Sequence, residues 1–406
     1  MEETIKDLQA SGDVLFLMLG AVMVFAMHAG FAFLEVGSVR KKNQVNGLCK
    51  IICDWGISTI VYFLVGFPIA YGISFLKPAS GLLGVSQGFE LVHFFFLLAF
   101  AACIPAIISG GIAERAKFWP QALAGGIFVG FVYPFFESLV WGKNLLLGQE
   151  GSWLAGLTGG IPFHDYAGSV VVHSIGGWLA LPAIIILGPR IGRYKGEKST
   201  WIKVSSLPFL ALGSWILAVG WFGFNVMSAQ SLTGISGLVA INSLMAMVGG
   251  IIAALVVSKN DAAFIHNGAL AGLIAICAGS DVVHPLGALA IGACGAVIFV
   301  FGFEVETEKY RIDDVLGVWP LHGIVGSFGG VAAGIFGQEG LGGLGGISIT
   351  AQLVGTGAAI VLALSASTVV YSLLNTLVGT RLTEHEELLG ADISIHRIEA
   401  NPEEAL

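Results

Sequence analysis

Eleven stretches of this chain are apolar for about 18 residues or more, the length that a helix needs to cross a membrane. Only 11% of the 406 residues are charged, whereas a water-soluble globular protein carries about 25%, so this chain could not cover a water-facing surface. Because the stretches are continuous and do not alternate, a transmembrane barrel is excluded. We therefore expect an all-α polytopic membrane protein with eleven transmembrane helices, at roughly 13–37, 51–75, 91–113, 118–141, 166–189, 207–228, 233–258, 262–280, 284–303, 315–338 and 349–375.

Basic residues lie almost entirely on one side of the expected membrane. When the connections between helices are assigned alternately to two sides, only Lys6, Lys77 and Lys143 fall on one side, and the other 16 of the 19 basic residues fall opposite. Since Lys and Arg concentrate in cytoplasmic loops, we expect an external amino terminus and a cytoplasmic tail over 381–406. The basic segment SVRKKNQ (38–44) is typical of a loop that anchors at anionic headgroups of membrane lipids. Neither it nor the net charge of −8 indicates a nucleic-acid partner.

Two segments far apart in the chain share one pattern. DYAGSVVVHSIGG (165–177) and DVLGVWPLHGIVG (314–326) each place a histidine eight residues after an aspartate, and a glycine four residues after the histidine. The first segment opens a helix that is expected to run inward and the second opens one that runs outward. Equivalent motifs on helices of opposite direction are typical of inverted-topology repeats, whose substrate sites lie near the membrane midplane. We expect a membrane domain over 1–380, with repeat halves at about 13–189 and 207–338 and an extra helix at about 349–375.

The charged and ionisable residues of these two segments suggest different roles. Asp165 and Asp314 start their helices, where a carboxylate caps free N–H groups and opposes the positive end of the helix dipole. His173 and His322 lie eight residues further on, or about 12 Å along the helix, and so well inside the bilayer. A lone histidine in an apolar helix is most often a packing residue, but two at symmetry-related positions indicate a function. We expect both to line a pore.

Other features receive structural interpretations. We expect Glu114 and Arg115 to form a local ion pair at the inner end of the third helix, and His164 to be solvated at the outer surface. The 58 glycines fit closely packed helices, as in AGGIFVG (124–130) and GGLGGIS (342–348). The five cysteines are odd in number and lack paired spacing, which argues against a disulfide framework or a metal site. With no nucleotide-binding loop and no Ser–His–Asp arrangement, we expect neither a cofactor nor catalytic residues.

Five motifs, in order along the predicted helices, resemble the ammonium transporter (Amt/Mep/Rh) family, and its Amt branch more than the Rhesus proteins. They are HAGFAFLEVGSVRKKNQVN (28–46), SGGIAERAKF (109–118), DYAGSVVVHSIGG (165–177), GWFGFNVMS (220–228) and DDVLGVWPLHGIVG (313–326). The resemblance implies eleven helices with inverted five-helix repeats, a location in the plasma membrane and a homotrimer with one pore per subunit. It also implies an ammonium or ammonia substrate, membrane lipids around the protein and a cytoplasmic PII-type regulatory partner.

The resemblance also assigns roles to individual residues. His173 and His322 match the paired pore histidines of the family, and Phe100 and Phe224 match the stacked phenylalanines that close the outer pore. Phe96, Trp141 and Ser228 match the external site that recruits ammonium, with Asp165 below it. The sequence departs from the pattern in three places. Trp153, in the long 143–164 loop, competes with Trp141 for the vestibule position, Leu97 replaces a glutamine found in many members, and the tail lacks the usual closing segment.

Energetics favours one transport mechanism over others. Moving an ammonium-sized charge into a dry medium costs about 20 kcal/mol in the idealised limit and several after relaxation. Removing a proton at pH 7 from an amine whose pKa is about 10 costs roughly 4–5 kcal/mol, so deprotonation, passage of ammonia and proton relay by the histidines are competitive if the pore is dry.

The alternatives are an ammonium sensor, which usually carries an appended signalling domain, and a neutral-gas channel, which the vestibule tryptophan disfavours. An intramembrane enzyme that used the histidine pair is disfavoured, because the sequence offers it neither a nucleophile nor a metal site.

Overall fold

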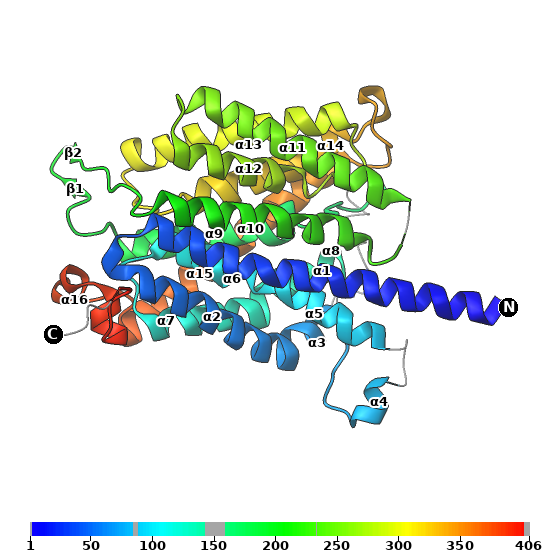
Figure 1. Ribbon diagram of the computed structural model, residues 1–406, viewed down its shortest axis with the longest axis horizontal. Coiled ribbons are helices and arrows are strands. Elements are labelled where there is room, and N and C mark those ends of the chain that lie inside the picture. The colour runs from blue at the N-terminus through cyan, green and yellow to red at the C-terminus, as the bar shows by residue number, and fades with distance from the viewer. Residues whose placement is uncertain (1, 84–87, 143–158, 233, 402–406) are drawn as a thin grey trace.

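The computed structural model describes residues 2–83, 88–142, 159–232 and 234–401 as one bundle of helices (Figure 1). Within these residues, ten helical segments are long and apolar enough to cross a membrane, and a shorter apolar helix covers Ala262–Ile276. Each of the eleven predicted runs coincides with one of these segments, so the prediction of an all-α polytopic membrane protein is confirmed.

The helices are continuous in some spans and interrupted in others. In the first half they are α1 (Glu2–Ser38), α2 (Gln44–Val61), α3 (Phe67–Tyr71), α4 (Ala79–Leu83), α5 (Phe89–Ala101), α6 (Cys103–Ile112), α7 (Phe118–Ile127), α8 (Tyr133–Val140) and α9 (Ile175–Leu187). The second half contains α10 (Leu207–Val226), α11 (Ile235–Val257), α12 (Ala262–Ile276), α13 (Pro285–Glu304) and α14 (Val325–Phe336). The additional helix α15 (Ile349–Val378) follows it, and α16 (Glu384–Leu389) lies in the tail. A two-stranded antiparallel hairpin, β1 (Tyr194–Lys195) and β2 (Lys198–Ser199), connects the halves.

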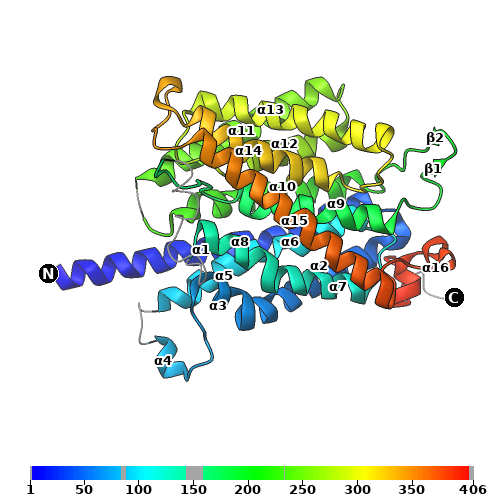
Figure 2. The ribbon, with the colours of Figure 1, turned by 180° about the vertical axis from the view of Figure 1, so that it is seen from behind.

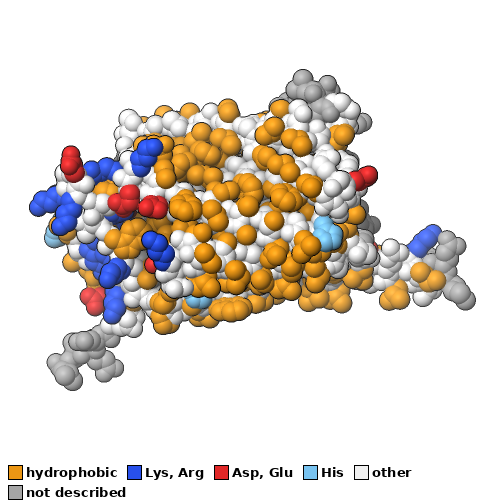
Figure 3. Space-filling view, turned by 90° about the horizontal axis from the view of Figure 1, so that it is seen from above, with side chains coloured by type: hydrophobic (Ala, Val, Ile, Leu, Met, Phe, Trp, Pro, Cys, Tyr) orange, Lys and Arg blue, Asp and Glu red, His pale blue; other side chains and the backbone are white. Residues whose placement is uncertain are grey.

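The two ends of the bundle differ in what they carry. The long helices run side by side, with the amino terminus at one end and the hairpin, α16 and the last described residues at the other (Figures 1 and 2). We call the latter the tail end. Basic and acidic side chains gather at the tail end, while hydrophobic side chains cover the middle of the visible face (Figure 3). Exposed apolar residues such as Ile60, Trp215, Val219 and Val361 lie on helices that are apolar enough to cross a membrane, where lipid tails would cover them.

The helices that carry the two histidines cross at their closest point through matched glycines. A Cβ atom on Gly177 would lie 2.0 Å from the backbone nitrogen of Gly323, and one on Gly326 would lie 2.7 Å from that of Ser174. In both cases the residue four positions after one histidine meets the residue directly after the other histidine. This reciprocal contact is the geometry that a two-fold relation between the halves requires.

The first helices of the two halves also lie against each other at close range. α1 and α10 pack along much of their length, and a Cβ atom on Gly37 or on Gly213 would approach a backbone nitrogen of the other helix to 2.3 Å. Small residues that let two backbones approach are characteristic of helix contacts in membranes. The expectation for AGGIFVG holds in the same way, since Gly125 meets Pro105 and Gly130 meets Val61. The expectation for GGLGGIS was wrong: this segment is a loop in which Gly342, Gly345 and Gly346 adopt positive φ.

Several spans are shorter or more broken than the apolar runs indicate. The eighth span ends at Ile276 because its last carbonyls bind elsewhere: those of Cys277 and Ala278 accept the N–H groups of Ala167 and Tyr166. In the third span, α5 and α6 are separated at Ala102, and Pro105 follows three residues later. A proline cannot donate the hydrogen bond that would continue the helix across this point. Both interruptions lie beside the segments that carry the predicted pore residues.

Candidate functional site

A cavity of about 140 Å³ opens near the end of the bundle opposite the tail. It is lined by four residues predicted for the outer site and gate together with four others, namely Phe96, Leu97, Phe100, Val140, Trp141, Tyr166, Ser228 and Gln230. We call it the vestibule. The predicted departure at Leu97 is therefore part of its wall, and the remainder consists of aromatic side chains, the Ser228 hydroxyl, the Gln230 amide and the aliphatic Val140. The rival Trp153 lies outside the described residues.

Hydrogen bonds fix the vestibule side chains from neighbouring segments. The Trp141 indole N–H donates to the backbone carbonyl of Asp165 at 2.6 Å, and the ring stands edge-on to Phe100 with centroids 6.0 Å apart. The Ser228 hydroxyl donates to the carbonyl of Phe224 at 2.7 Å. Because its hydrogen is used in this bond, the hydroxyl oxygen presents lone pairs and can accept an N–H bond from a cation. The faces of Trp141 and Phe96 can attract the same cation through their π electrons.

Two phenylalanines close the inner side of the vestibule. Phe100, from the end of α5, and Phe224, from the end of α10, stack with ring centroids 3.9 Å apart and planes at 10°. Both are fully buried, at 1% and 0% exposed. Stacked rings in contact leave no room for a hydrated ion between them, so a solute must displace at least one ring to pass.

The two histidines lie directly beyond these rings. The His173 ring is 5.4 Å from that of Phe224, and its Nδ1 is 3.2 Å from the Nδ1 of His322. Trp221 stacks on His173 at 5.0 Å, and Phe31 lies 6.5 Å from His322. Each histidine sits in a π-helical turn, Ser169–Ser174 or Trp319–Ile324, a widening of the helix that is frequent at functional sites.

The hydrogen bond between the two Nδ1 atoms constrains where the imidazole rings carry their protons. When both rings are neutral, one Nδ1 carries a hydrogen and the other accepts it, so the two rings are opposite tautomers. The remaining ring nitrogens are then available to exchange protons with other groups. The Nε2 atom of His173 is buried and has no hydrogen-bond partner among the described residues. This arrangement can pass a proton along the pore by switching tautomers.

The two predicted aspartates cap the helices that carry the histidines. Their carboxylates accept N–H groups of the next turn at 2.8 to 2.9 Å, from Gly168, Val170 and Val171 for Asp165 and from Gly317 and Trp319 for Asp314. Burial raises the pKa of both carboxyls, that of Asp314 to about 6, although the N–H groups oppose this effect. Asp165 is 2% exposed and its side chain does not line the vestibule, so its geometry is that of a support for the helix and for Trp141.

A second, much smaller cavity lies on the tail side of the histidines. Its volume is about 20 Å³, enough for about one water molecule. His322 and Glu35 both line it, together with apolar side chains of α1, α6 and the segment before α14. Glu35 has no role among the predictions from the sequence, and the signal that could have found it is a carboxylate within an otherwise apolar helix.

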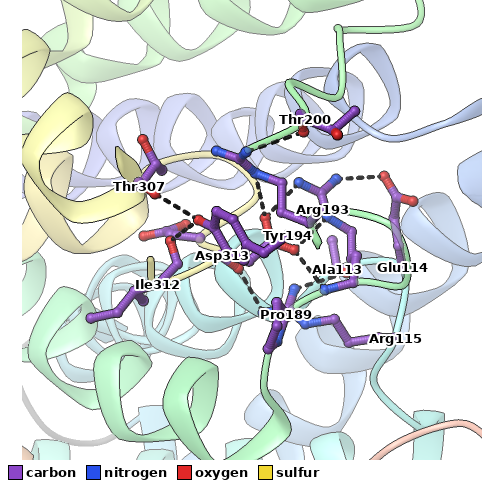
Figure 4. Close-up of polar contacts among 12 residues, drawn as sticks. Ala113, Glu114, Arg115, Pro189, Arg193, Tyr194, Thr200, Thr307, Ile312 and Asp313 are labelled. Carbon is purple, nitrogen blue, oxygen red and sulfur yellow. Dashed lines mark hydrogen bonds and ion pairs between the residues drawn. The ribbon is translucent and has the colours of Figure 1, made fainter. Parts of the chain in front are cut away.

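A network of charged side chains holds the tail end together, and it differs from the predicted pair. Glu114 accepts bonds from Arg40 and Arg190, and Arg190 also pairs with Asp313. Figure 4 labels Glu114 and Asp313 of this network together with Arg193. The Arg193 guanidinium lies 3.5 Å from the Asp313 carboxylate. Burial would raise the pKa of the Asp313 carboxyl, but hydrogen bonds from Arg190 and its charge hold that pKa well below its usual value.

Two predicted structural roles were therefore wrong. Arg115 does not bind Glu114; its guanidinium donates to backbone carbonyls, those of Gly111, Ala113, Gly188 and Asp313. The reason is local: Glu114 has a positive φ of 71°, which turns the two neighbouring side chains apart. His164 is also not simply solvated, because its Nε2 lies 3.0 Å from Asp281 and the contact is partly buried.

The tail is docked against the rest of the chain. Asp392 accepts the N–H groups of Val45 and Asn46 at the start of α2, and His396 contacts the Asn46 side chain at 3.1 Å. Arg381 pairs with Glu387 at 2.7 Å. Asp392 and His396 of the tail thus bind the start of α2 in the same chain.

Comparisons with known proteins agree with this arrangement. Residues 15–401 match the model of the Ammonium Transporter Family. The chain is 40% identical over 412 residues to ammonium transporter Amt2 of Methanocaldococcus jannaschii, covering 100% of this chain and 94% of the relative, and 36% identical to Amt1 of the same organism, covering 97% of each. Among solved structures, one titled Sensor Amt Protein superposes with a TM-score of 0.86 at 31% identity, covering 96% of this chain and 99% of that one. Mep2 of Candida albicans shares the fold, with a TM-score of 0.79 at 23% identity, covering 93% of this chain and 87% of that one.

Proposed function

The chain belongs to the ammonium transporter family, and on that premise we propose that it conducts ammonium across the plasma membrane by separating the ion into ammonia and a proton. The observation that carries the proposal is the pair of hydrogen-bonded imidazoles, His173 and His322, directly behind the stacked rings of Phe100 and Phe224. The histidine pair offers a route for a proton, and the stacked rings directly beside it form a barrier to a hydrated ion. The amino terminus is external and the tail cytoplasmic in this proposal, so the vestibule opens outward.

Recruitment occurs in the vestibule. Ammonium binds against the faces of Trp141 and Phe96 and donates one N–H bond to the Ser228 hydroxyl. An aromatic face stabilises a cation by about 0.5 to 2 kcal/mol as the cation loses water. Asp165 contributes indirectly, since its backbone carbonyl orients Trp141 and its side chain caps the helix that carries His173.

Deprotonation occurs before the histidines. Bringing the intact ion into the apolar pore costs several kcal/mol even after relaxation, whereas removing its proton at pH 7 costs roughly 4–5 kcal/mol. Ammonia then moves past the phenylalanines, while the proton is passed between the two Nδ1 atoms. Potassium carries no proton to lose, so the same pore rejects it.

An ammonium sensor is the second candidate, and a specific observation favours it. The solved structure titled Sensor Amt Protein superposes on 96% of this chain. In a sensor the tail, bound here to α2 through Asp392, would report occupancy of the vestibule.

A homotrimer and a cytoplasmic PII-type regulator remain part of the proposal, the regulator acting through the tail. A neutral ammonia gas channel would use the same pore without moving charge.

Electrical recording on proteoliposomes tests these functions against one another. A pulse of ammonium should evoke an inward current, a pulse of potassium should not, and His173→Ala and His322→Ala should each remove the current because the proton route is lost. Ammonia flux of similar size without current would contradict the relay and support the gas channel. Binding of ammonium without any flux would support the sensor.

A further inference from the structure

A buried charged cluster lies between the histidine pair and the tail end. The Glu35 carboxylate accepts the Ser109 hydroxyl at 2.6 Å and pairs with the Lys50 ammonium at 3.2 Å. Lys50 also donates to the Gln121 side chain at 3.4 Å. Glu35 and Lys50 are each 2% exposed. These residues come from α1, α2, α6 and α7, so four helices build the cluster.

The cluster contains more negative than positive groups. Asp54 lies one turn after Lys50 on α2 and is 4% exposed, and its Oδ2 atom has no hydrogen-bond partner among the described residues. The Nε2 atom of Gln121 is buried and similarly unpartnered within that part of the chain. The buried cluster therefore holds two carboxyl groups and one ammonium, and a second negative charge would be costly there unless a proton or a cation compensated it.

A small cavity joins this cluster to the pore. Glu35 and His322 line the same space of about 20 Å³, which suits one water molecule or one ammonia molecule. On the other side, Glu35 lies three residues before the end of α1 at Ser38, or about 4.5 Å along the helix axis. The carboxylate is therefore placed between the second histidine and the tail-end solution.

We propose that Glu35 is the proton acceptor at the inner end of the pore, which receives the proton from His322 through the molecule in this cavity and releases it to the tail side. The proposal rests on the proposed function. One ammonium ion gives up one proton in the vestibule, and that proton moves through His173 and His322 to the Glu35 carboxylate. Ammonia regains a proton in the tail-side solution, so one ammonium ion is transferred in total. Lys50 and Ser109 hold the carboxylate at the cavity.

Replacing the carboxylate by an amide of the same shape separates this role from a structural one. Glu35→Gln keeps the side-chain volume but removes the acid, and we expect the ammonium-evoked current in proteoliposomes to fall by about tenfold or more. Ammonia influx, measured by stopped flow with an internal pH dye and corrected for protein-free liposomes, should change less than twofold, since the pore is intact. Glu35→Asp restores an acid in the same place and should recover a substantial part of the current.

The matched control is a second buried carboxylate outside the pore. Glu137, in α8, is 0% exposed and binds the hydroxyls of Tyr62 and Tyr71. It lines neither the vestibule nor the small cavity. Glu137→Gln should leave the current unchanged in protein that elutes as a single assembly.

The outcomes distinguish this proposal from the function on which it rests. Wild-type protein without ammonium-evoked current would overturn the proposed function itself. Full current in Glu35→Gln, beside an active wild type, would overturn only the role of Glu35. A parallel loss of current and ammonia influx in both Glu35→Gln and Glu35→Asp would also overturn it, because it would show that Glu35 only supports the fold of the pore.

Discussion

Individual side chains determine the outer end and the centre of the proposed pore. At the outer end, Trp141 is fixed by its bond to the Asp165 carbonyl and offers a ring to a cation. At its centre, His173 and His322 are held 3.2 Å apart by two helices that could not approach if either carried a larger residue at the crossing. In the proposed mechanism the first group stabilises a charge weakly and the second moves a proton, so substitutions at the two places should have different consequences.

Replacing Trp141 tests the weaker of these contributions. Trp141→Leu removes a cation–π contact of about 1 kcal/mol, so the apparent affinity for ammonium in the current assay should fall about fivefold while the preference over potassium remains. Trp119→Leu is a matched control, because that indole is 74% exposed on the outer surface of the bundle. A complete loss of selective current in Trp141→Leu, with the control unaffected, would contradict the assignment of recruitment to this ring.

At the scale of helices, the crossing of α9 and α14 is the contact that positions the histidines. Gly177→Ala would place a methyl group 2.0 Å from the backbone of Gly323, and such overpacking costs about 1–3 kcal/mol or more. We expect the thermal unfolding midpoint in detergent, measured by intrinsic tryptophan fluorescence, to fall by several degrees.

A glycine with open space beside it gives the control for this substitution. Gly357 lies within α15, and a Cβ atom there would meet nothing within 4 Å. Gly357→Ala should leave the midpoint unchanged or raise it, since alanine favours the helix by about 1 kcal/mol. Equal midpoints for the two variants would show that the helices separate easily and that the close crossing does not hold the histidine pair.

The same elements show what the sequence can predict. Apolar length and basic loops predict where the helices lie, because these properties follow from the bilayer and not from the neighbours of a residue. The break at Ala102, the early end of α12 and the π-helical turns are not predictable in that way, because each depends on which backbone groups meet across helices.

The candidate site was predictable to a similar degree. The repeated Asp–His–Gly pattern predicts that His173 and His322 come together, and the resemblance to a family predicts the vestibule residues. Glu35 and Trp221 gave no comparable signal: their positions beside a cavity or a histidine depend on the angle at which α1 and α10 pack. The partners of Arg115 and Glu114 were missed because a single positive φ at Glu114 reverses which way the side chains point.

In the whole molecule, the charged network at the tail end is a further connection between the two halves, in addition to the contacts between membrane helices. Arg190 follows α9, Asp313 precedes the second histidine segment, and Glu114 follows α6, so their ion pairs join both halves of the chain. Asp313 is 2% exposed. Removing one partner from a buried pair costs about 3–5 kcal/mol because the remaining charge is left uncompensated. We therefore expect Asp313→Asn to lower the unfolding midpoint clearly at pH 7.

The destabilisation caused by Asp313→Asn should become smaller as the pH falls. The pKa of Asp313 is held below its usual value in the folded protein by Arg190, whereas in the unfolded chain it is about 4. The stabilisation is therefore complete above about pH 4 and declines as the pH falls toward the folded pKa, by about 1.4 kcal/mol per unit. The difference in midpoint between wild type and Asp313→Asn should narrow from pH 5 to pH 3, and Arg190→Gln should show the same narrowing because it removes the cause of the shift. A difference that stays constant over this range in both variants would mean that Arg190 does not hold Asp313 ionised at the tail end.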